Sequence, residues 1–414
     1  MKVLIVGSGG REHALGYKIK QSPAVSHLYF APGNGGTCSL GKNVDIPVTE
    51  IERLKDFAAK EKIDLTVVGP ELPLSLGIVD AFRNAGLTVF GPDKTAAQLE
   101  TSKAFSKKFM QTYQIPTADY QVFNHFTHAL DYLQTACYPI VIKADGLAAG
   151  KGVVICKGYT EAERAIQLIM QDRVFGSEGE TVVIEEFLEG KEVSMLCFTD
   201  TQTIVPMESA SDYKRAFDND EGLNTGGMGS ISPSFYGLPH ECLEIAEKTL
   251  KGLQKEGFDY RGVIYIGLML TATGPKVLEY NVRFGDPETE ALLPRLTSDL
   301  FLILKAVSEK RLKEADITWS EKPALTVILA AQGYPESYSS GEEIVLPPQT
   351  EELVVFHSGT RCEDGRLLSS GGRVLAVTAV GDDMKQARKT CYDYIKTITF
   401  PNSFHRTDIG EEKK

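Results

Sequence analysis

The residues best suited to chemistry lie in one short segment, residues 276–288, in which apolar and polar residues alternate. This alternation predicts a β-strand. Since alternate strand residues share a face, Glu279, Asn281 and Arg283 are expected to project side by side. Carboxylate and amide oxygens suit Mg²⁺, and a guanidinium suits phosphate or carboxylate. The segment therefore predicts a metal and phosphate site, with a solvated edge strand as the alternative. The opposite face is expected to carry Leu278, Tyr280 and Val282.

A second candidate phosphate site is the glycine-rich segment 143–153. It is not a Walker A loop, because Asp145 stands where the first Gly belongs and Gly152 follows Lys151. A strand, not a helix, is expected after it. The composition predicts a mobile hairpin that closes over a triphosphate, with Lys143 reaching a phosphate from the preceding strand. A surface hairpin without a ligand is the alternative.

The turn at residues 7–10 follows a strand and opens a helix, an arrangement whose backbone N–H groups bind phosphate. The dinucleotide motif fails at its third position, which is Glu12. The next strand ends at residues 30–32 without an acid for a ribose hydroxyl. The turn therefore predicts a mononucleotide-sized phosphate site and not an NAD site, a tight turn without a ligand being the alternative. His13 beside it is a candidate substrate contact.

Two further stretches combine charge with loop-forming residues. Residues 185–192 end a strand and turn, so their backbone could pair with a purine edge while Glu192 accepts ribose hydroxyls. Residues 211–215 supply two cations, and residues 224–230 expose backbone donors through their glycines. Solvated surface loops are the alternative, although long loops dense in Gly and charge are often functional.

The composition is that of a globular protein with several domains. The chain has 414 residues, of which 42% are hydrophobic and 24% charged, so more than one core is expected. A net charge of −12 disfavours a nucleic-acid or anionic-membrane binder, because phosphate backbones reward clustered cations. The 7 cysteines lack metal spacing, and no apolar run reaches membrane length. We expect a reducing cytoplasm with thiols in the core.

The elements that must position these residues alternate in type over the first hundred residues. Strands are expected at 3–6, 27–30, 64–68 and 87–90, and helices at 11–21, 50–60 and 76–85. This order predicts a parallel, Rossmann-like sheet, with ligands at the carboxyl ends of its strands. The whole is expected to be an α/β and α+β multidomain protein. Its units are 1–100, a central unit of 101–120 and 194–318, a flap unit of 121–193, and a separate, mostly β unit of 323–414.

Together these segments resemble the ATP-grasp superfamily and, within it, the phosphoribosylamine–glycine ligase family of purine synthesis. The segments that carry the resemblance are 7–13, 32–36, 69–71, 143–153, 224–229 and 279–288. It implies a preATP-grasp domain, ATP-grasp domains with a mobile flap, and a small C-terminal domain. It also implies ligation of glycine to 5-phosphoribosylamine through glycyl phosphate, giving glycinamide ribonucleotide, ADP and phosphate. ATP with Mg²⁺ or Mn²⁺, a cytoplasmic location and a monomer are expected, without nucleic-acid or membrane partners.

The resemblance also implies roles for individual residues. Metal ligation falls to Glu279 and Asn281. ATP contacts are implied for Lys103, Lys143, Gly146, Gly150, Lys151, Gly152, Glu185, Leu188 and Glu192. The substrate carboxylate and the transferring phosphoryl group fall to Arg283, Lys214 and Asp212. The phosphoribosylamine site is implied at Gly9, Gly10, Asn34, Gly35 and Glu71, and further substrate contacts at Asn224, Thr225 and Gly226.

The chain departs from the family pattern at three places. Where many ATP-grasp proteins carry a metal-binding acid, it has residues 267–269, Gly-Leu-Met, so a second metal is not assigned. Lys191 stands where an acid is common, which leaves ribose recognition to Glu192, and Leu223 replaces a common Pro. Two rival interpretations stay open. One is an ATP-grasp ligase or carboxylase for another acid, and the other is a nucleotide sensor without activity.

Overall fold

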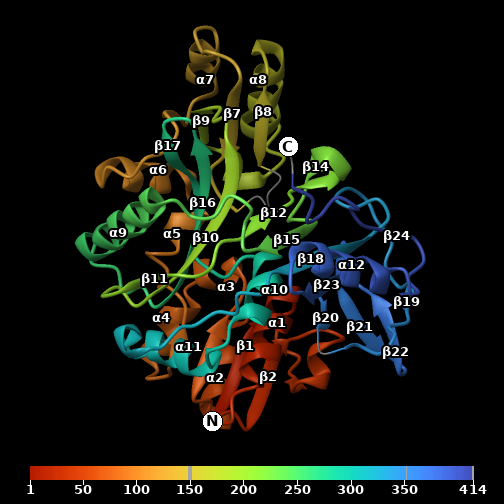
Figure 1. Cartoon of the computed structure of the whole chain (residues 1–414). Coiled ribbons are helices and arrows are strands. Elements are labelled where there is room, and N and C mark those ends of the chain that lie inside the picture. Colours follow the sequence, from red (N-terminus) through yellow and green to blue (C-terminus); the bar gives the residue numbers. More distant parts are fainter. Residues whose placement is uncertain (148–151, 351, 413–414) are drawn as a thin grey trace.

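The structure, a computed structural model, describes residues 1–147, 152–350 and 352–412 (Figure 1). Its N-terminal sheet is parallel, with strand order β3-β2-β1-β4-β5, which confirms the expected architecture. The strands are β1 (Lys2–Gly7), β2 (His27–Pro32), β3 (Lys42–Asn43), β4 (Leu65–Val68) and β5 (Val89–Phe90). Residues 3–6 are fully buried, as a central parallel strand requires.

Helices flank this sheet at most of the expected positions. They are α1 (Gly10–Ile19), α2 (Ile51–Glu61), α3 (Glu71–Ser75) and α4 (Ile78–Asn84). The single helix expected at 76–85 is wrong at its start, because Gly77 has a φ of 87° and separates α3 from α4. This left-handed conformation suits glycine and interrupts a helix. Glu71 consequently becomes the first residue of a short helix that faces the central region.

The flap unit forms the upper lobe in Figure 1. Its antiparallel sheet has the order β6-β9-β7-β8. The elements are β6 (Tyr120–Phe123), α7 (Phe126–Leu133), β7 (Ile140–Ala144), β8 (Val153–Cys156), α8 (Tyr159–Ile166) and β9 (Val182–Glu186). Buried Ile142, Ile166 and Ile184 give this unit a core of its own. Gly150 and Lys151 lie outside the described residues, so the tip of the expected hairpin is not characterised.

The central sheet has the order β11-β10-β16-β17. Its strands are β10 (Lys191–Thr199), β11 (Ile204–Pro206), β16 (Gly262–Thr271) and β17 (Gly274–Asn281). Surrounding helices are α5 (Gln98–Thr101), α6 (Lys103–Thr112), α9 (His240–Lys255), α10 (Glu288–Leu292) and α11 (Leu300–Ser308). The register of β16 with β17 skips Leu278. This irregularity is a β-bulge, and it turns Leu278 toward the site, so placing Leu278 on the face opposite Glu279 is wrong. Tyr280 and Val282 are buried as expected.

The C-terminal sheet draws strands from two distant parts of the chain. Its order is β12-β15-β18-β23-β20, and β24 also pairs with β18. The late strands are β18 (Ala324–Ala331), β20 (Leu353–His357), β23 (Arg373–Val380) and β24 (Ser403–Phe404), covered by α12 (Met384–Ile395). The early ones are β12 (Ser211–Asp212) and β15 (Gly229–Ser232). The C-terminal unit is therefore not separate, since backbone hydrogen bonds join it to the central segment.

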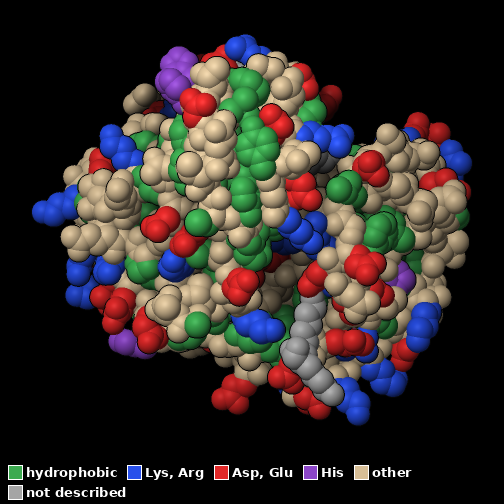
Figure 2. Space-filling model, turned by 90° about the horizontal axis from the view of Figure 1, so that it is seen from above, with side chains coloured by type: hydrophobic (Ala, Val, Ile, Leu, Met, Phe, Trp, Pro, Cys, Tyr) green, Lys and Arg blue, Asp and Glu red, His purple; other side chains and the backbone are tan. Residues whose placement is uncertain are grey.

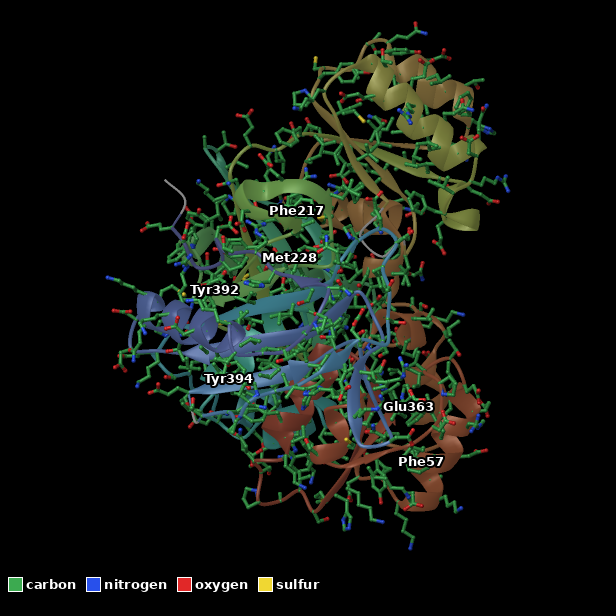
Figure 3. All side chains as sticks on the ribbon, turned by 90° about the vertical axis from the view of Figure 1, so that its right-hand side faces the viewer. Phe57, Phe217, Met228, Glu363, Tyr392 and Tyr394 are labelled. Atoms are coloured by element: carbon green, nitrogen blue, oxygen red, sulfur yellow. The ribbon has the colours of Figure 1, made fainter. Side chains whose placement is uncertain are left out.

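A small three-stranded sheet links the C-terminal unit to the N-terminal domain. It comprises β19 (Glu343–Ile344), β21 (Thr360–Glu363) and β22 (Arg366–Ser369). The N–H of Gly35 donates to the carbonyl of Thr360 at 3.0 Å. Figure 3 shows this hairpin, marked by Glu363, beside the N-terminal domain that carries Phe57.

Two composition-based expectations can be compared with the structure. Among the described residues, no helix is long and apolar enough to cross a membrane. Four cysteines are buried as expected, but Cys38, Cys137 and Cys362 are exposed. Placing every thiol in the core is therefore wrong, because Cys38 lies in a one-turn 3-10 helix, Cys137 in an irregular segment and Cys362 on the exposed strand β21.

Candidate active site

A cavity of about 850 Å³ lies where the flap, the central sheet and the C-terminal sheet meet. It brings together most of the predicted site residues, from segments far apart in sequence. These are Glu71, Lys103, Lys143, Gly152, Glu185, Leu188, Glu192, Asp212, Lys214, Asn224, Thr225, Gly226, Glu279, Asn281 and Arg283. Viewed from above, the Lys and Arg side chains on the outer face are interspersed with Asp and Glu (Figure 2). The cavity itself is lined by Lys103, Lys143, Lys214 and Arg283, so an acidic chain has local cationic groups there, as a small anionic ligand requires.

Glu279 and Asn281 stand at the end of β17 and face the cavity, as the alternation predicts. Burial alone would raise the pKa of Glu279, but the positive charges of Lys214 and Lys143 lower it. The net result is a pKa below the ordinary value of a glutamate. An ionised carboxylate beside an amide oxygen fits a hard cation. Gly267 lies opposite Glu279 in the ladder and has no side chain to add a ligand. Among the described residues, no group of three or more His, Cys, Asp or Glu could hold a metal ion. A cation here would therefore take its other ligands from water and phosphate.

Two buried lysines share one carboxylate beneath the flap. Lys143 Nζ lies 2.9 Å from Glu185 Oε1, and Lys107 Nζ lies 2.9 Å from Glu185 Oε2. Lys143 also donates to the carbonyl of Leu278 at 3.1 Å, which aims its ammonium at the end of β17. Burial lowers the pKa of Lys107 to about 8, although Glu185 counteracts part of that effect. In this structure Glu185 orients the lysines, whereas the resemblance implied a direct ATP contact for it.

Arg283 is held between carboxylates at the floor of the cavity. Its Nη2 lies 3.1 Å from Glu100 Oε1, and its Nε lies 3.4 Å from Glu71 Oε2. Glu100 also accepts the Val282 N–H at 2.7 Å, so one carboxylate fixes both backbone and side chain. Burial lowers the pKa of Arg283, but Glu100 and Glu71 more than compensate and raise it above its ordinary value. Arg283 is thus a rigid, permanent cation whose Nη2 also reaches Asn281 Oδ1 at 3.2 Å.

Lys214 and Asp212 also line the cavity. Lys214 Nζ pairs with Glu192 and lies 3.9 Å from Asp212 Oδ1. Burial and the nearby Glu288 raise the pKa of Asp212 well above its ordinary value. Glu192, expected to receive ribose hydroxyls, therefore has an ion pair with a site lysine as its partner here.

The predicted phosphoribosylamine residues lie partly outside this cavity. Glu71 lines it, but Gly9, Gly10, Asn34 and Gly35 do not. The side chain of Asn34 is hydrogen-bonded to backbone groups. Its Nδ2 donates to the carbonyls of Ser8 at 2.8 Å and His357 at 2.7 Å. Asn34 Oδ1 accepts the N–H groups of two residues in its own turn. The four residues therefore form one structured turn pair beside the C-terminal unit.

The flap residues that can be described lie at the edge of the site. Lys103 Nζ donates to the carbonyl of Gly146, which ties the first residue of α6 to the base of the flap hairpin. Gly146 has a φ of 143°, and a Cβ there would clash with Glu178. The hairpin therefore requires glycine at this position. His13, named as a candidate substrate contact, is buried and does not line the cavity.

Sequence reasoning missed three residues that organise the site. Glu100 and Lys107 are charged residues on short helices with nothing unusual around them in sequence, and only their burial marks them. Arg373 at the start of β23 donates to the carbonyl of Gly226 at 2.7 Å and pairs with Asp286 at 2.9 Å. A lone Arg at a strand end gives no sequence signal, because its partners lie more than eighty residues away.

Three family models match adjoining parts of the chain. The phosphoribosylglycinamide synthetase N domain matches residues 1–100, the ATP-grasp (A) domain of that family matches residues 101–289, and its C domain matches residues 324–412.

Individual relatives agree with these matches. The phosphoribosylamine–glycine ligase of Caldanaerobacter subterraneus is 49% identical over 414 residues, covering 99% of each chain. The crystal structure of phosphoribosylamine–glycine ligase from Thermotoga maritima has a TM-score of 0.87 at 36% identity, covering 99% of this chain and 100% of that one. The biotin carboxylase domain of Hydrogenobacter thermophilus 2-oxoglutarate carboxylase, solved with MgADP, has a TM-score of 0.76 at 15% identity and covers 98% and 91%. The last likeness concerns the fold alone. The expected ATP-grasp architecture is confirmed by the family model that matches residues 101–289.

Proposed function

The chain belongs to the phosphoribosylglycinamide synthetase family, and on that premise we propose that its site ligates glycine to 5-phosphoribosylamine with ATP. The products are glycinamide ribonucleotide, ADP and phosphate, as in de novo purine synthesis. The observation that carries the proposal is the cavity itself. It places four cations around the ionised Glu279, namely Lys103, Lys143, Lys214 and Arg283. The cations can neutralise phosphate charge, and Glu279 can serve as a ligand for a metal cation. Full-length similarity to ligases of this name supports it.

The reaction needs two steps, because a carboxylate is a poor acylating agent. A glycine carboxylate oxygen first attacks the γ-phosphorus of ATP, the bond to the bridging oxygen breaks, and ADP leaves. The amine of phosphoribosylamine then attacks the carbonyl carbon of glycyl phosphate, loses a proton, and expels phosphate as the amide forms. Phosphoryl transfer depends mainly on positioning and on neutralising charge. A site built from fixed cations supplies both.

We assign the residues of the cavity to these steps as follows. Lys143 and Lys103 hold phosphate oxygens of ATP, and Glu185 orients Lys143 through their 2.9 Å contact. Arg283 takes the glycine carboxylate and then the transferring phosphoryl group, together with Asp212 and Lys214. Leu188 and the backbone near it contact the adenine. The flap excludes water, which would otherwise hydrolyse glycyl phosphate.

Glu279 and Asn281 fit Mg²⁺, and they would hold the ion where it could offset the negative charge of the ATP phosphates. The donor set, one ionised carboxylate oxygen and one amide oxygen, leaves room for phosphate and water ligands. The neighbour solved with MgADP supports a nucleotide–magnesium pair on this fold. Mn²⁺, another hard divalent ion, is the expected substitute.

We place phosphoribosylamine toward the N-terminal turns. Glu71, at the start of α3, lines the cavity, and its Oε2 lies 3.9 Å from Nη1 of Arg11, the residue after Gly10. The turn pair at Gly9, Gly10, Asn34 and Gly35 is on this side. Asn224, Thr225 and Gly226 approach the cavity from the C-terminal sheet and complete the amine side of the site. We further propose a monomeric cytoplasmic enzyme that acts on small molecules without nucleic-acid or membrane partners. Of its four expected units, the central and C-terminal ones share a sheet.

The test is phosphate release from ATP and Mg²⁺ with glycine, with and without freshly generated phosphoribosylamine. Release that requires both substrates, with glycinamide ribonucleotide identified by mass spectrometry, is the expected result. Release with neither substrate, or no release with both, would contradict the proposal. A panel of other acids and amines then distinguishes another ATP-grasp ligase from a protein that only binds nucleotide.

A further inference from the structure

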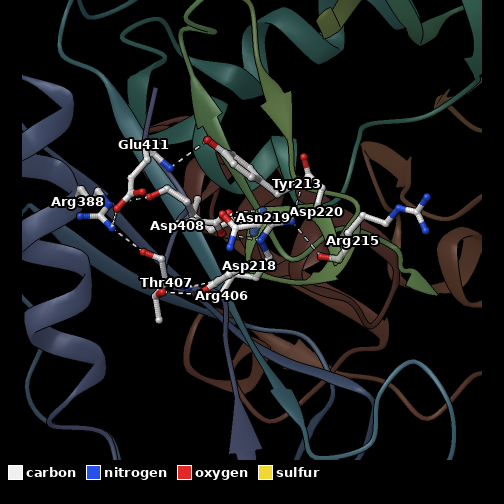
Figure 4. A network of polar contacts seen from close by, with 12 residues as sticks. Tyr213, Arg215, Asp218, Asn219, Asp220, Arg388, Arg406, Thr407, Asp408 and Glu411 are labelled. Carbon is white, nitrogen blue, oxygen red and sulfur yellow. Dashed lines mark hydrogen bonds and ion pairs between the residues drawn. The ribbon is translucent and has the colours of Figure 1, made fainter. Parts of the chain in front are cut away.

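The last described residues of the chain reach back to the loop that carries Lys214 (Figure 4). We call residues 406–411 the C-terminal clamp and residues 213–226 the substrate loop. The loop contains a hairpin of β13 (Arg215–Phe217) and β14 (Glu221–Asn224). The clamp follows β24, and nearly two hundred residues separate the two segments in sequence.

The hairpin has little to hold it in place by itself. Only Arg215 with Asn224 and Phe217 with Glu221 pair across it, and the register shifts between them. Phe217 and Leu223 are 53% and 52% exposed, so the hairpin does not bury an apolar face of its own. An isolated two-stranded hairpin is marginal in water. Its position must therefore come from contacts with other segments.

Arg406 is the centre of those contacts. Its side chain is fully buried and forms a bidentate pair with Asp408, at 2.7 and 2.6 Å. Nη1 also donates to Asp220 Oδ1 at 3.0 Å and to the carbonyl of Arg215 at 3.1 Å. A buried guanidinium satisfied in this way is geometrically rigid. It therefore fixes the backbone of the loop relative to the C-terminal sheet.

These contacts bracket Lys214 on both sides. The guanidinium of Arg406 lies 5.0 Å from the ring centre of Tyr213, and it binds the carbonyl of Arg215. The carbonyl of Lys214 in turn accepts from the N–H and the hydroxyl of Thr225, at 2.8 and 2.9 Å. A displacement of Arg406 would therefore move Lys214 and Thr225 together.

The tip of the hairpin is fastened separately. Asp218 accepts from the N–H of Thr407 at 2.7 Å and from its hydroxyl, and the N–H of Asn219 donates to Asp408 at 3.0 Å. Behind the clamp, Arg388 of α12 donates to the carbonyl of Thr407 at 2.6 Å. Figure 3 shows Tyr392 of the same helix on the side of the molecule that carries Phe217. The clamp is thus anchored on one side and holds the loop on the other.

We propose that Arg406 is a positioning residue for the ligation reaction, holding Lys214 and Thr225 at the substrates through Tyr213 and Arg215. The inference rests on the proposed function, since it takes Lys214 as a group that acts on substrate. Arg406 itself does not line the cavity. Its loss should therefore affect the chemical step more than the binding of ATP, whose lysines lie on other elements.

The experiment compares Arg406→Met with a matched control, Arg295→Met. Arg295 is equally buried and equally bonded, to Ser232, Glu208 and the carbonyls of two further residues, but it does not contact the substrate loop. For Arg406→Met we expect kcat to fall about tenfold to a hundredfold, with the KM for ATP changed less than about twofold. Arg295→Met should lose thermal stability without this fall in kcat. Amide hydrogen exchange should accelerate over residues 213–226 in Arg406→Met alone.

Each outcome decides the inference. Unchanged exchange in the loop, or faster exchange with an unchanged kcat, would overturn it. An equal fall of kcat in both variants would reduce Arg406 to a stabilising residue. Should Arg406→Met not fold, Asp218→Ala removes only the tip contacts and should give the same pattern with a smaller fall. If the wild-type protein makes no glycinamide ribonucleotide, the proposed function fails, while hydrogen exchange still decides whether the clamp orders the loop.

Discussion

Replacing Glu279 with Gln isolates the contribution of one negative charge at the centre of the cavity. The amide has nearly the same size and keeps an oxygen acceptor, so packing around β17 should not change. The carboxylate is ionised because Lys214, Lys143 and Lys103 together outweigh its burial. Among the described residues, no cluster of three acidic or His and Cys ligands could replace it. The substitution therefore leaves the predicted metal with neutral protein oxygens only.

The magnitude follows from the role of this charge. Removing one fixed group that stabilises the transition state costs about 3 to 4 kcal/mol, or about a hundredfold to a thousandfold in kcat. The assay is the initial rate of phosphate release at saturating substrates over a titration of MgCl₂. We expect kcat to fall by that factor, the Mg²⁺ requirement to rise, and the Tm to stay within a few degrees.

The control for this experiment is Glu256→Gln. Among the described residues, this carboxylate accepts a hydrogen bond only from the Tyr113 hydroxyl, at 2.7 Å, and it does not line the cavity. It should leave both kcat and the Mg²⁺ dependence unchanged. A Glu279→Gln enzyme with kcat within about twofold of the wild type at the same Mg²⁺ concentration would refute the metal assignment, since a phosphoryl-transfer site cannot lose such a group unnoticed.

Three further predictions concern the groups around the cavity. Lys143→Met should raise the KM for ATP at least about tenfold, because a hydrogen bond to a charged group contributes about 1.5–3 kcal/mol; an unchanged KM in steady-state kinetics would exclude the phosphate role. Gly69→Ala should lower the free energy of unfolding by about 1–3 kcal/mol, and with it the Tm, because the added Cβ would lie 1.9 Å from Glu12 Oε1. A melting curve like that of the wild type would contradict this. Burial lowers the pKa of His13 to about 3, below its unfolded value, so the unfolded chain binds more protons below about pH 6.5. The free energy of unfolding should therefore fall on acidification from pH 6.5 toward 3, by up to about 1.4 kcal/mol per pH unit. In unfolding curves recorded from pH 7 to 5, His13→Gln should reduce this dependence of the unfolding free energy on pH.

The N-terminal sheet and the polar face of β17 could be predicted because both depend on local periodicity. Four short apolar runs separated by helical stretches have few arrangements other than a parallel sheet. Alternation likewise places Glu279 and Asn281 on one face without knowledge of the rest of the chain. The bulge at Leu278 could not be predicted, since it depends on the partner strand β16.

The supporting residues could not be predicted, because their roles exist only between distant segments. Glu100 belongs to the site because it forms an ion pair with Arg283, and Lys107 because it forms one with Glu185. Neither position differs in sequence from an ordinary solvated helix residue. Glu185 was identified, but as an ATP contact, because the sequence does not show that two lysines converge on it.

The division into domains was the expectation that the structure changed most. Strands β12 and β15, which flank the substrate loop, pair into a sheet otherwise made from the last hundred residues. A strand-rich C-terminal segment looks independent in sequence because its own strands follow one another. Strand pairing across more than ninety residues leaves no local pattern that would show this connection.

The shared sheet has a consequence for the order in which the protein can mature during synthesis. The lysines at residues 103 and 143 and the β17 carboxylate emerge early, whereas β18, β23 and residue 406 emerge last. A growing chain can therefore fold its nucleotide-facing elements well before its substrate loop has a partner strand. The contacts that the clamp makes with the substrate loop therefore form only after residues 406–411 have been synthesised. A chain shortened before residue 406 would lack these contacts.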